Sequence, residues 1–347
     1  MDMPKLQFDY LRRYGVEIEV NAFDGKDHIA PDKMPEGIYT VGNIVSSAIF
    51  DKVDVKFWRE SLEHWDKHKP GNWLVKPDGS CGMEVCSPIS KGWNGLNMIC
   101  LVIDALASNQ IKADNRCSLH IHVEVNDLTV YELANVITYW IKCEPVFFDA
   151  FPEIRKNNKY CEFIGWTDWV QADTDVSAEE IVRFFGNQKY TSINTFHYNK
   201  GRPTIEIRIA DSVFCTNSYF TKNWIKLVIH FIEMARKMPT PTKYVPGDPW
   251  SSFLWLDPPA VFKLLGWDGN YELSEGMKQT RNWFLARMIE NLGRSNVPIL
   301  SLAGRRVAHA AVFDIIKKLM NKNEFDPREA IAPKNIHDAV YDKIYRA

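Results

Sequence analysis

Short apolar stretches of this chain carry polar side chains two positions apart. The alternation is typical of β-strands, in which residues i and i+2 project from the same face of a sheet. Each pair therefore places two charged or imidazole groups on one side of a predicted sheet. The stretches are 15–20 with Glu17 and Glu19, 82–88 with the single acid Glu84, 119–123 with His120 and His122, and 204–208 with Glu206 and Arg208.

The rest of the pattern predicts helices between these strands. Apolar residues recur there every three or four positions, and Ser, Thr or Asp residues stand where such segments begin. Helices are expected over 92–109, after a cap at Asp127 or Thr129, from a capping box at Ser177 and Glu180 through Phe185, and over 217–237. Two strands are expected around the turn Pro77-Asp78-Gly79, two more at 190–198 and 203–211, and a loop at 145–175.

The character of the sequence changes after residue 238. A segment rich in proline and tryptophan follows, and then a mainly helical pattern without acid or histidine pairs at strand spacing. The sequence therefore predicts an α+β domain over residues 1–238 and a mainly helical C-terminal extension over 239–347.

Composition narrows the class of protein. With 46% hydrophobic and 25% charged residues the chain is expected to fold into a globular protein, and its net charge of −2 gives little support to a nucleic-acid substrate. No apolar run is long enough to span a bilayer, and the N-terminus lacks the layout of a signal peptide. Seven cysteines without a Cys-x-x-Cys pair favour reduced thiols, with Cys86 assigned to core packing. We expect a cytoplasmic protein without a membrane partner, and a virus-encoded protein acting in the host cytoplasm would have the same composition.

The paired polar residues favour a divalent cation. One such pair alone is more often a solvated strand face or an intrasheet ion pair, but several pairs on sheet-like stretches are harder to explain without compensation for the charge. Carboxylates with few imidazoles favour magnesium or manganese. A zinc hydrolase built on His120 and His122 would lack a third histidine at useful spacing. Nearby arginines would suit phosphate groups, and neither common glycine-rich phosphate loop is present.

A series of polar motifs runs along the chain between residues 14 and 235. The motifs are Glu17-Ile18-Glu19, Lys76-Pro77-Asp78-Gly79-Ser80, Glu84-Val85-Cys86-Ser87-Pro88, Cys117-Ser118-Leu119-His120-Ile121-His122, Arg155 with Tyr160-Cys161, and Tyr190 through Asn194 leading to Thr204-Ile205-Glu206-Ile207-Arg208. In order and spacing, they resemble the motifs of the amidoligase family. That family belongs to the carboxylate–amine ligase superfamily, with glutamine synthetase and glutamate–cysteine ligase. The chain departs from the family at Ser118, where the family commonly has glycine, and at Ala210-Asp211-Ser212, where it often has Gly-Thr.

The resemblance implies both a fold and a reaction. The fold would be a glutamine-synthetase-like domain with a curved, mostly antiparallel sheet and helices packed on one side. The reaction would join a carboxylate to an amine at the expense of ATP, with Mg²⁺ or Mn²⁺, through an acyl phosphate. The implied metal ligands are Glu17, Glu19, Glu84, His120, His122 and Glu206. The implied nucleotide-binding residues are Lys76, Arg155, Arg202 and Arg208, and the implied catalytic residues are Asp78, Glu206 and Arg208.

The motifs are also compatible with two other functions. One is a phosphotransferase of the same superfamily, which would phosphorylate its acceptor and need no amine. The other is a non-catalytic nucleotide-binding or scaffold protein. The substrates are expected to be a carboxylate and an amine carried by a small molecule, a peptide or a modified macromolecule.

Overall fold

The chain folds into two compact units whose segments interleave along the sequence. A computed structural model describes residues 4–7, 11–21, 34–49, 51, 53–55, 71–156, 158–164, 177–239, 255–291 and 302–325. The sheet unit comprises Tyr10–Glu124 and Thr204–Lys222, and the helical unit comprises Met1–Asp9, Val125–Pro203 and Asn223–Ala347. The predicted division at residue 238 stays a prediction.

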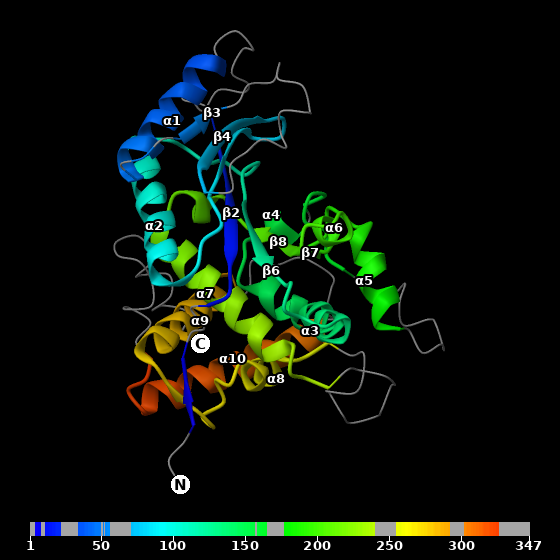
Figure 1. The fold of residues 1–347 in the computed structure, drawn as a ribbon. Helices are drawn as coiled ribbons and strands as arrows, with labels where there is room; N and C mark the ends of the chain where they lie inside the picture. Colours follow the sequence, from blue (N-terminus) through cyan, green and yellow to red (C-terminus); the bar gives the residue numbers. More distant parts are fainter. Residues whose placement is uncertain are drawn as a thin grey trace. The chain divides into compact units, whose positions relative to one another are not determined.

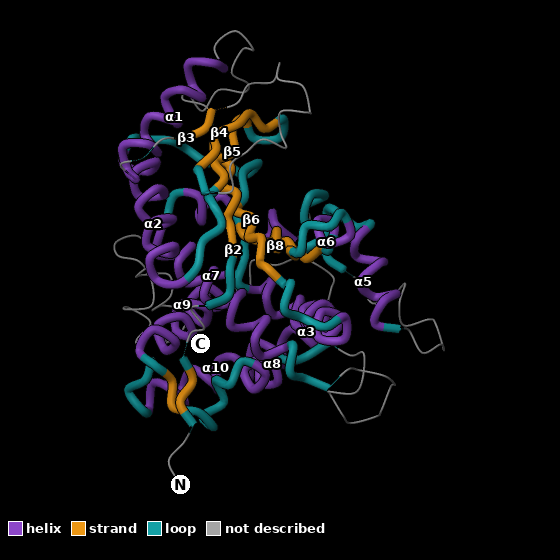
Figure 2. The backbone as a smooth tube through the Cα atoms, in the orientation of Figure 1, coloured by secondary structure: helices purple, strands orange, loops and turns teal. Residues whose placement is uncertain are grey.

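The sheet unit is built on strands that follow the order β3-β4-β5-β2-β6-β8 (Figures 1 and 2). They are β2 (Tyr14–Val20), β3 (Val53–Val55), β4 (Trp73–Asp78), β5 (Gly82–Cys86), β6 (Leu119–Glu124) and β8 (Thr204–Ala210). β3 and β4 are parallel, and every other neighbouring pair in this order is antiparallel. The predicted α+β class with a mostly antiparallel sheet is confirmed.

One face of this sheet is apolar. Ile18, Ile121 and Ile207 lie on three adjacent strands, and none of these side chains is exposed. Because side chains alternate along a strand, the neighbours of these residues in the chain project from the opposite face. α1 (Met34–Ile49) packs against α2 (Gly92–Ser108) and against β3 and β4 (Figure 1). The short helix η3 (Ser212–Cys215) and the first turn of α7 (Ser218–Ala235) complete the unit.

The helical unit is organised around α3. Within the described part of the chain it also contains β1 (Lys5–Leu6), which pairs with β9 (Glu272–Leu273), and the short strand β7 (Ile193–Asn194). The helices are α3 (Val130–Asp149), α4 (Glu153–Lys156), α5 (Ala178–Gly186), α6 (Phe196–Asn199), the main part of α7, α8 (Pro258–Leu264), α9 (Glu275–Asn291) and α10 (Leu302–Asn321). Trp140 of α3 lies 4.8 Å from the ring of Phe147 and 5.4 Å from that of Phe231, which makes an aromatic core.

Two predicted helix starts are confirmed in detail. The Thr129 side chain accepts a hydrogen bond from the backbone of Glu132, and the Glu132 side chain reaches back to Thr129. Ser177 and Glu180 form the same reciprocal arrangement at the start of α5. Each capping box satisfies backbone N–H groups that a helix leaves unpaired at its first turn.

The predicted loop over 145–175 is wrong in its first part. α3 continues through Pro145 to Asp149, and α4 follows after a short break. Proline inside a helix removes one hydrogen bond and costs about 3 kcal/mol. Here Phe147 and Phe148 in the next turn are completely buried, so packing of that turn outweighs the cost. Residues 165–176 lie outside the described residues.

The predicted strand over 190–198 is also largely wrong. Only Ile193 and Asn194 form a strand, and the short helix α6 follows. The Asn194 side chain accepts a hydrogen bond from Phe196 N, and Thr195 Oγ1 donates to Val182 O. A side chain that binds backbone two residues away, as Asn194 does, competes with a strand ladder. The alternation of apolar residues alone did not reveal this competition.

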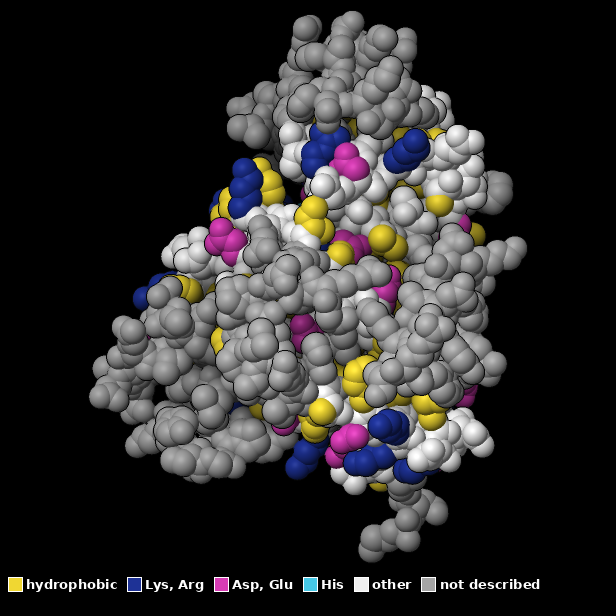
Figure 3. Space-filling view, turned by 180° about the vertical axis from the view of Figure 1, so that it is seen from behind, with side chains coloured by type: hydrophobic (Ala, Val, Ile, Leu, Met, Phe, Trp, Pro, Cys, Tyr) yellow, Lys and Arg dark blue, Asp and Glu magenta, His cyan; other side chains and the backbone are white. Residues whose placement is uncertain are grey.

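The distribution of charged side chains on the described surface agrees with the small net charge of the chain. On the face shown in Figure 3, the described Lys and Arg side chains lie beside Asp and Glu side chains and form no continuous basic surface. In the part of the chain that the structure describes, no helix has the length and apolarity needed to cross a membrane. All seven cysteines are free thiols, as the sequence predicts.

Candidate functional site

The polar residues singled out in the sequence meet on one face of the sheet unit. Glu17 of β2 stands opposite His120 of β6 and opposite Cys86 of β5. Glu19, two residues along, stands opposite Glu84. The register of neighbouring strands thus brings together, within one unit, side chains that are far apart in the sequence, such as Glu17 and His120, which are 103 positions apart.

The same face extends to β4 on one side and to β8 on the other. Lys76 of β4 is paired in register with Glu84, and Glu206 of β8 is paired with His122. The β6–β8 register shifts between Leu119 and Ile121, so that two residues of β8, one of them Arg208, face the single position of His120. Such a bulge re-aims side chains next to functional sites. It leaves Glu206 and Arg208 within hydrogen-bond contact of each other.

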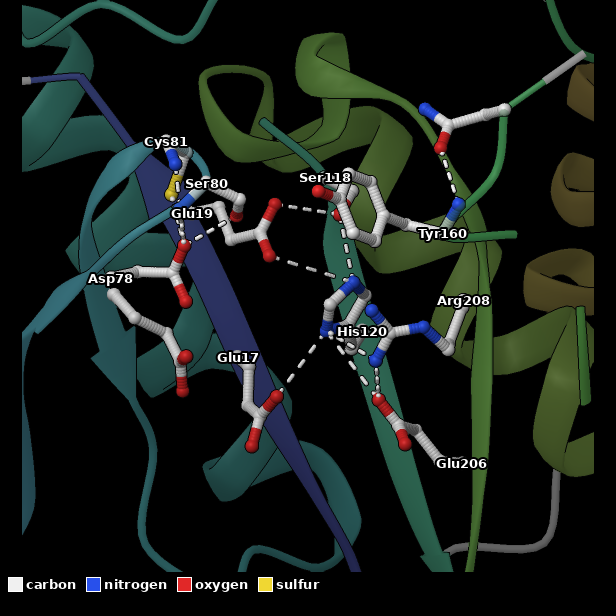
Figure 4. Close-up of polar contacts among 12 residues, drawn as sticks. Glu17, Glu19, Asp78, Ser80, Cys81, Ser118, His120, Tyr160, Glu206 and Arg208 are labelled. Atoms are coloured by element: carbon white, nitrogen blue, oxygen red, sulfur yellow. Dashed lines mark hydrogen bonds and ion pairs between the residues drawn. The ribbon is translucent and has the colours of Figure 1, made fainter. Parts of the chain in front are cut away.

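His120 is the centre of the cluster (Figure 4). Its Nδ1 lies 3.2 Å from Glu17 Oε2 and 3.5 Å from Glu206 Oε1. Its Nε2 lies 2.7 Å from Ser118 Oγ and 3.7 Å from Glu19 Oε1. The imidazole is only 3% exposed, so each ring nitrogen depends on these neighbours for hydrogen bonding.

Two groups of potential metal ligands in the sheet unit share Glu17, and a third consists of Glu19, Asp78 and Cys81. Glu17, His120 and Glu206 each offer one donor atom, and these atoms lie within 4.8 Å of one another. Glu17, Glu84 and Cys86 form a second group with the same spread. Oxygen-rich donor sets of this kind suit Mg²⁺ or Mn²⁺, whereas a thiol favours softer metals.

The charges in the cluster are strongly coupled. Burial and the charge of Glu17 raise the pKa of Glu84 to about 7, although Lys76 and Cys86 oppose the rise. Burial also acts to raise the pKa of Glu17, but the charge of His122 and hydrogen bonds from both histidines hold it well below its usual range. The converging carboxylates therefore create a negative field that only positive groups can balance.

His122 responds to that field. Its Nε2 lies 3.2 Å from Glu17 Oε1. Burial acts to lower the pKa of His122, but the charge of Glu17 and its hydrogen bond, with the charges of Glu206 and Glu84, raise the pKa to about 9. Whether His122 is a metal ligand stays a prediction.

Lys76 and Asp78 have clear structural partners. The Lys76 ammonium lies 2.8 Å from Glu84 Oε1, inside the cluster. Asp78 Oδ1 accepts hydrogen bonds from the backbone N–H groups of Ser80 at 2.7 Å and Cys81 at 3.2 Å, which forms the turn between β4 and β5. Burial acts to raise the pKa of Asp78, but hydrogen bonds from the side chains and backbone N–H groups of Ser80 and Cys81 lower it. Nucleotide binding by Lys76 and catalysis by Asp78 stay predictions.

Arg155 and Arg202 belong to the helical unit. The Arg155 side chain, on α4, is 2% exposed, and Arg202 is exposed after the turn that ends α6. Their predicted part in nucleotide binding therefore stays a prediction.

Two residues of the cluster were missed in the sequence. Ser118 Oγ lies 2.7 Å from Glu19 Oε2, and Cys86 Sγ donates to Glu84 Oε1 at 2.9 Å. The assignment of Cys86 to core packing is wrong, because this thiol lies on the polar face. Extending the two-residue spacing by one step, from His120 back to Ser118 and from Glu84 on to Cys86, would have found both.

Comparison with known proteins assigns most of this chain to one family. Residues 11–232 match the family model described as "Putative amidoligase enzyme". No curated protein sequence matches the chain. Among solved structures, the chain is similar to that titled "Crystal structure of the complex between Prokaryotic Ubiquitin-like Protein Pup and its Ligase PafA", with 12% identity, a TM-score of 0.34, and coverage of 90% of this chain and 63% of that one.

A second solved structure is a bifunctional glutathione synthetase from Pasteurella multocida. It has 10% identity and a TM-score of 0.34, with coverage of 88% of this chain and 52% of that one. The chain thus spans less than two thirds of either structure's chain. A TM-score this low does not assign a shared activity, so the family match and the geometry of the sheet carry the argument.

Proposed function

Because this chain belongs to the amidoligase family of carboxylate–amine ligases, we propose that it uses ATP and Mg²⁺ to form an amide or isopeptide bond. A carboxylate is a poor electrophile, and transfer of the ATP γ-phosphoryl group converts it to an acyl phosphate. The substrate amine then attacks the acyl carbon through a tetrahedral intermediate, and inorganic phosphate leaves. Phosphoryl transfer of this kind depends mainly on positioning and charge neutralisation.

The observation that carries the proposal is the convergence of carboxylates on one polar sheet face. Glu17, Glu206 and His120 already place donor atoms within 4.8 Å of one another, and burial with the charge of Glu17 raises the pKa of Glu84 to about 7. A divalent cation would relieve the repulsion among these acids. The residues that would hold Mg²⁺, or Mn²⁺ in its place, are Glu17, Glu19, Glu84, His120, His122 and Glu206. When bound, the ions would neutralise the phosphates of ATP.

Arg208 is the proposed stabiliser of the transferring phosphoryl group. The bulge in β8 and the contact with Glu206 hold its guanidinium at the edge of the cluster, with Nη1 3.5 Å from His120 Nδ1. Burial acts to lower the pKa of Arg208, but the charges of Glu206 and Glu17 raise it, so the side chain stays positive. Loss of such a contact costs about 3 kcal/mol, on the order of a hundredfold in rate.

The family resemblance implies roles for four further residues. Lys76 would balance part of the charge near the nucleotide through its ion pair with Glu84. Arg155 and Arg202 would bind phosphate or the substrate carboxylate, as the resemblance implies. Asp78 would bind the amine substrate through its oxygen Oδ2, since Oδ1 accepts the hydrogen bonds from Ser80 and Cys81 that shape the turn.

The test is release of ADP from ATP in the presence of Mg²⁺ and a pool of amino acids and polyamines. We expect release that depends on an amine, and loss of it in Glu206→Ala and Arg208→Ala. Matched controls are Glu124→Ala and Arg13→Ala, because this pair is joined by a hydrogen bond from Arg13 Nε to Glu124 Oε2 at 2.6 Å and neither residue is in the cluster. Release that needs no amine would instead indicate a phosphotransferase. No turnover, with ATP binding unchanged in both site variants, would refute the site assignment.

A further inference from the structure

The Ser118 hydroxyl joins two residues of the cluster. Its Oγ lies 2.7 Å from Glu19 Oε2 and 2.7 Å from His120 Nε2 (Figure 4). Ser118 is 4% exposed, Glu19 5% and His120 3%, so these three groups satisfy one another in a nearly dry environment. Both contacts are therefore expected to be occupied hydrogen bonds.

The number of protons available fixes the direction of both bonds. A hydroxyl has one proton to donate, and Ser118 Oγ donates to Glu19 Oε2. The Ser118 proton therefore goes to Glu19, and the Ser118 oxygen must accept a proton from His120. It follows that His120 Nε2 carries a hydrogen.

The other ring nitrogen of His120, Nδ1, faces the carboxylates of Glu17 and Glu206 and the guanidinium of Arg208. Nδ1 lies 3.2 Å from Glu17 Oε2, 3.5 Å from Glu206 Oε1 and 3.5 Å from Arg208 Nη1. The two carboxylates favour a proton or a metal ion at Nδ1, whereas the guanidinium can only donate and so favours a lone pair there. A cation held between Nδ1 and the two carboxylates satisfies these three groups, while Arg208 keeps its contact with Glu206. Nε2–H is the tautomer that leaves Nδ1 free to bind the cation.

We propose that Ser118 is a positioning residue that holds His120 as the Nε2–H tautomer, so that Nδ1 becomes a metal ligand. The inference rests on the proposed function, because it requires cation binding by Glu17, His120 and Glu206. Ser118 acts through His120 and Glu19 and is not itself a ligand. Glycine, which the amidoligase family commonly has at this position, has no hydroxyl, so the device is specific to a chain that carries serine here.

The first experiment measures binding of Mn²⁺ to the full chain by electron paramagnetic resonance of the free ion. Ser118→Ala and Ser118→Gly are expected to weaken binding by about tenfold to a hundredfold, the usual effect of losing a hydrogen-bond partner of a ligating histidine. Ser118→Thr keeps the hydroxyl and is expected to bind like wild type. Ser90→Ala is the matched control, because Ser90 is a buried serine of the same unit whose hydroxyl donates to Pro88 O at 3.1 Å.

The second experiment observes the tautomer directly. Nitrogen NMR of histidine rings, recorded on the Mg²⁺-loaded full chain, is expected to show His120 protonated at Nε2, with the assignment made from His120→Gln. In Ser118→Ala the Nε2 proton is expected to exchange faster with water, or the signals of both tautomers to appear. A purely structural role for Ser118 would change neither signal while the protein stays folded.

The outcomes separate this inference from the proposed function. If Glu206→Gln weakens Mn²⁺ binding while Ser118→Ala binds like wild type, the role of Ser118 is refuted and the metal site stands. If wild type does not bind Mn²⁺, or Glu206→Gln has no effect, both proposals fail. A wild-type His120 protonated only at Nδ1 would overturn the inference whatever the affinities are. If Ser118→Thr proves unfolded, Ser118→Ala compared with Ser90→Ala still decides.

Discussion

Glu144 in the helical unit and Glu84 in the sheet unit are both buried glutamates whose pKa is raised, yet their surroundings differ. Burial alone raises the pKa of Glu144 to about 8, and its carboxyl group accepts hydrogen bonds from the Ser192 hydroxyl and, at 2.9 Å, from Ile164 N. Burial and the charge of Glu17 raise the pKa of Glu84 to about 7, and Lys76 lies 2.8 Å away.

The comparison separates a buried acid with neutral partners from buried acids that converge on one another. A buried acid with only neutral partners takes up a proton and serves as a hydrogen-bonding group of the core. Acids that converge cannot all do this, because each one shifts the titration of the others and the group needs positive charge. Only the second arrangement is ready to exchange a protein cation for a metal ion, which is why the sheet unit is the candidate active site.

The largest effect on stability is expected from removing the cation of the cluster. Lys76→Met keeps the length of the side chain but leaves Glu84 and Glu17 without the ammonium group. Breaking a buried pair in this way costs about 3 to 5 kcal/mol in the free energy of unfolding. Lys76 and Glu84 side chains are only 16% and 8% exposed, so solvent screens the pair little. Urea unfolding followed by tryptophan fluorescence measures the change.

Added Mg²⁺ provides a second test of this prediction. If the cluster binds a divalent cation, added Mg²⁺ is expected to restore part of the stability lost in Lys76→Met, because ligands that bind the native state stabilise it. Lys112→Met, at an exposed lysine of the same unit, is expected to change stability by less than about 0.5 kcal/mol. Equal losses in the two variants, or no response to Mg²⁺, would contradict the comparison.

A smaller effect on the free energy of unfolding is expected at Glu144, and this effect depends on pH. The folded pKa of about 8 lies above the ordinary value of 4.5, so the stabilising contribution of this group is complete below pH 4.5 and is lost as pH rises through 8. Wild type is expected to lose about 2 kcal/mol more than Glu144→Gln between about pH 6 and about pH 8. Unfolding curves at both pH values measure the difference. Parallel pH profiles would mean that Glu144 is ionised in the core.

The smallest effect on stability is expected at His230, a buried histidine of the helical unit. Its Nε2 donates to Leu265 O at 2.8 Å, and burial, reinforced by the charge of Lys237, lowers its pKa to about 4 although the hydrogen bond opposes the shift. The folded pKa lies below 6.5, so the contribution is present above pH 6.5 and is lost as pH falls toward 4. Relative to His230→Gln, wild type is expected to lose about 1 kcal/mol between about pH 6.5 and about pH 5.5. A variant with the same acid sensitivity as wild type would show that His230 is protonated in the fold.

Much of the candidate site could be predicted because strand geometry is local. The two-residue spacing in Glu17 and Glu19, or in His120 and His122, assigns side chains to one face without knowledge of neighbouring strands. Helix starts were equally local, since Thr129 and Ser177 make their capping bonds within three residues. The family resemblance added the order of the motifs and, through it, the reaction class.

The errors arose where distant packing decided the outcome. Pro145 predicts a break, but the buried side chains of Phe147 and Phe148 keep the helix intact. The stretch around Asn194 alternates like a strand, but its side chains bind nearby backbone instead. Cys86 has apolar neighbours in sequence, yet strand pairing sets it opposite Glu17 on the polar face.

The sequence by itself determined which residues alternate, where helices are capped and which family the motifs resemble, because these features depend on neighbours in the chain. Only the tertiary structure decided that β2 lies between β5 and β6, that Lys76 neutralises Glu84, and that a shifted register brings Arg208 to His120. Strand order and register depend on pairing between residues far apart in sequence, and a one-residue slip would move every side chain to the other face. The charge balance of the cluster follows from that register, so no local pattern could supply it.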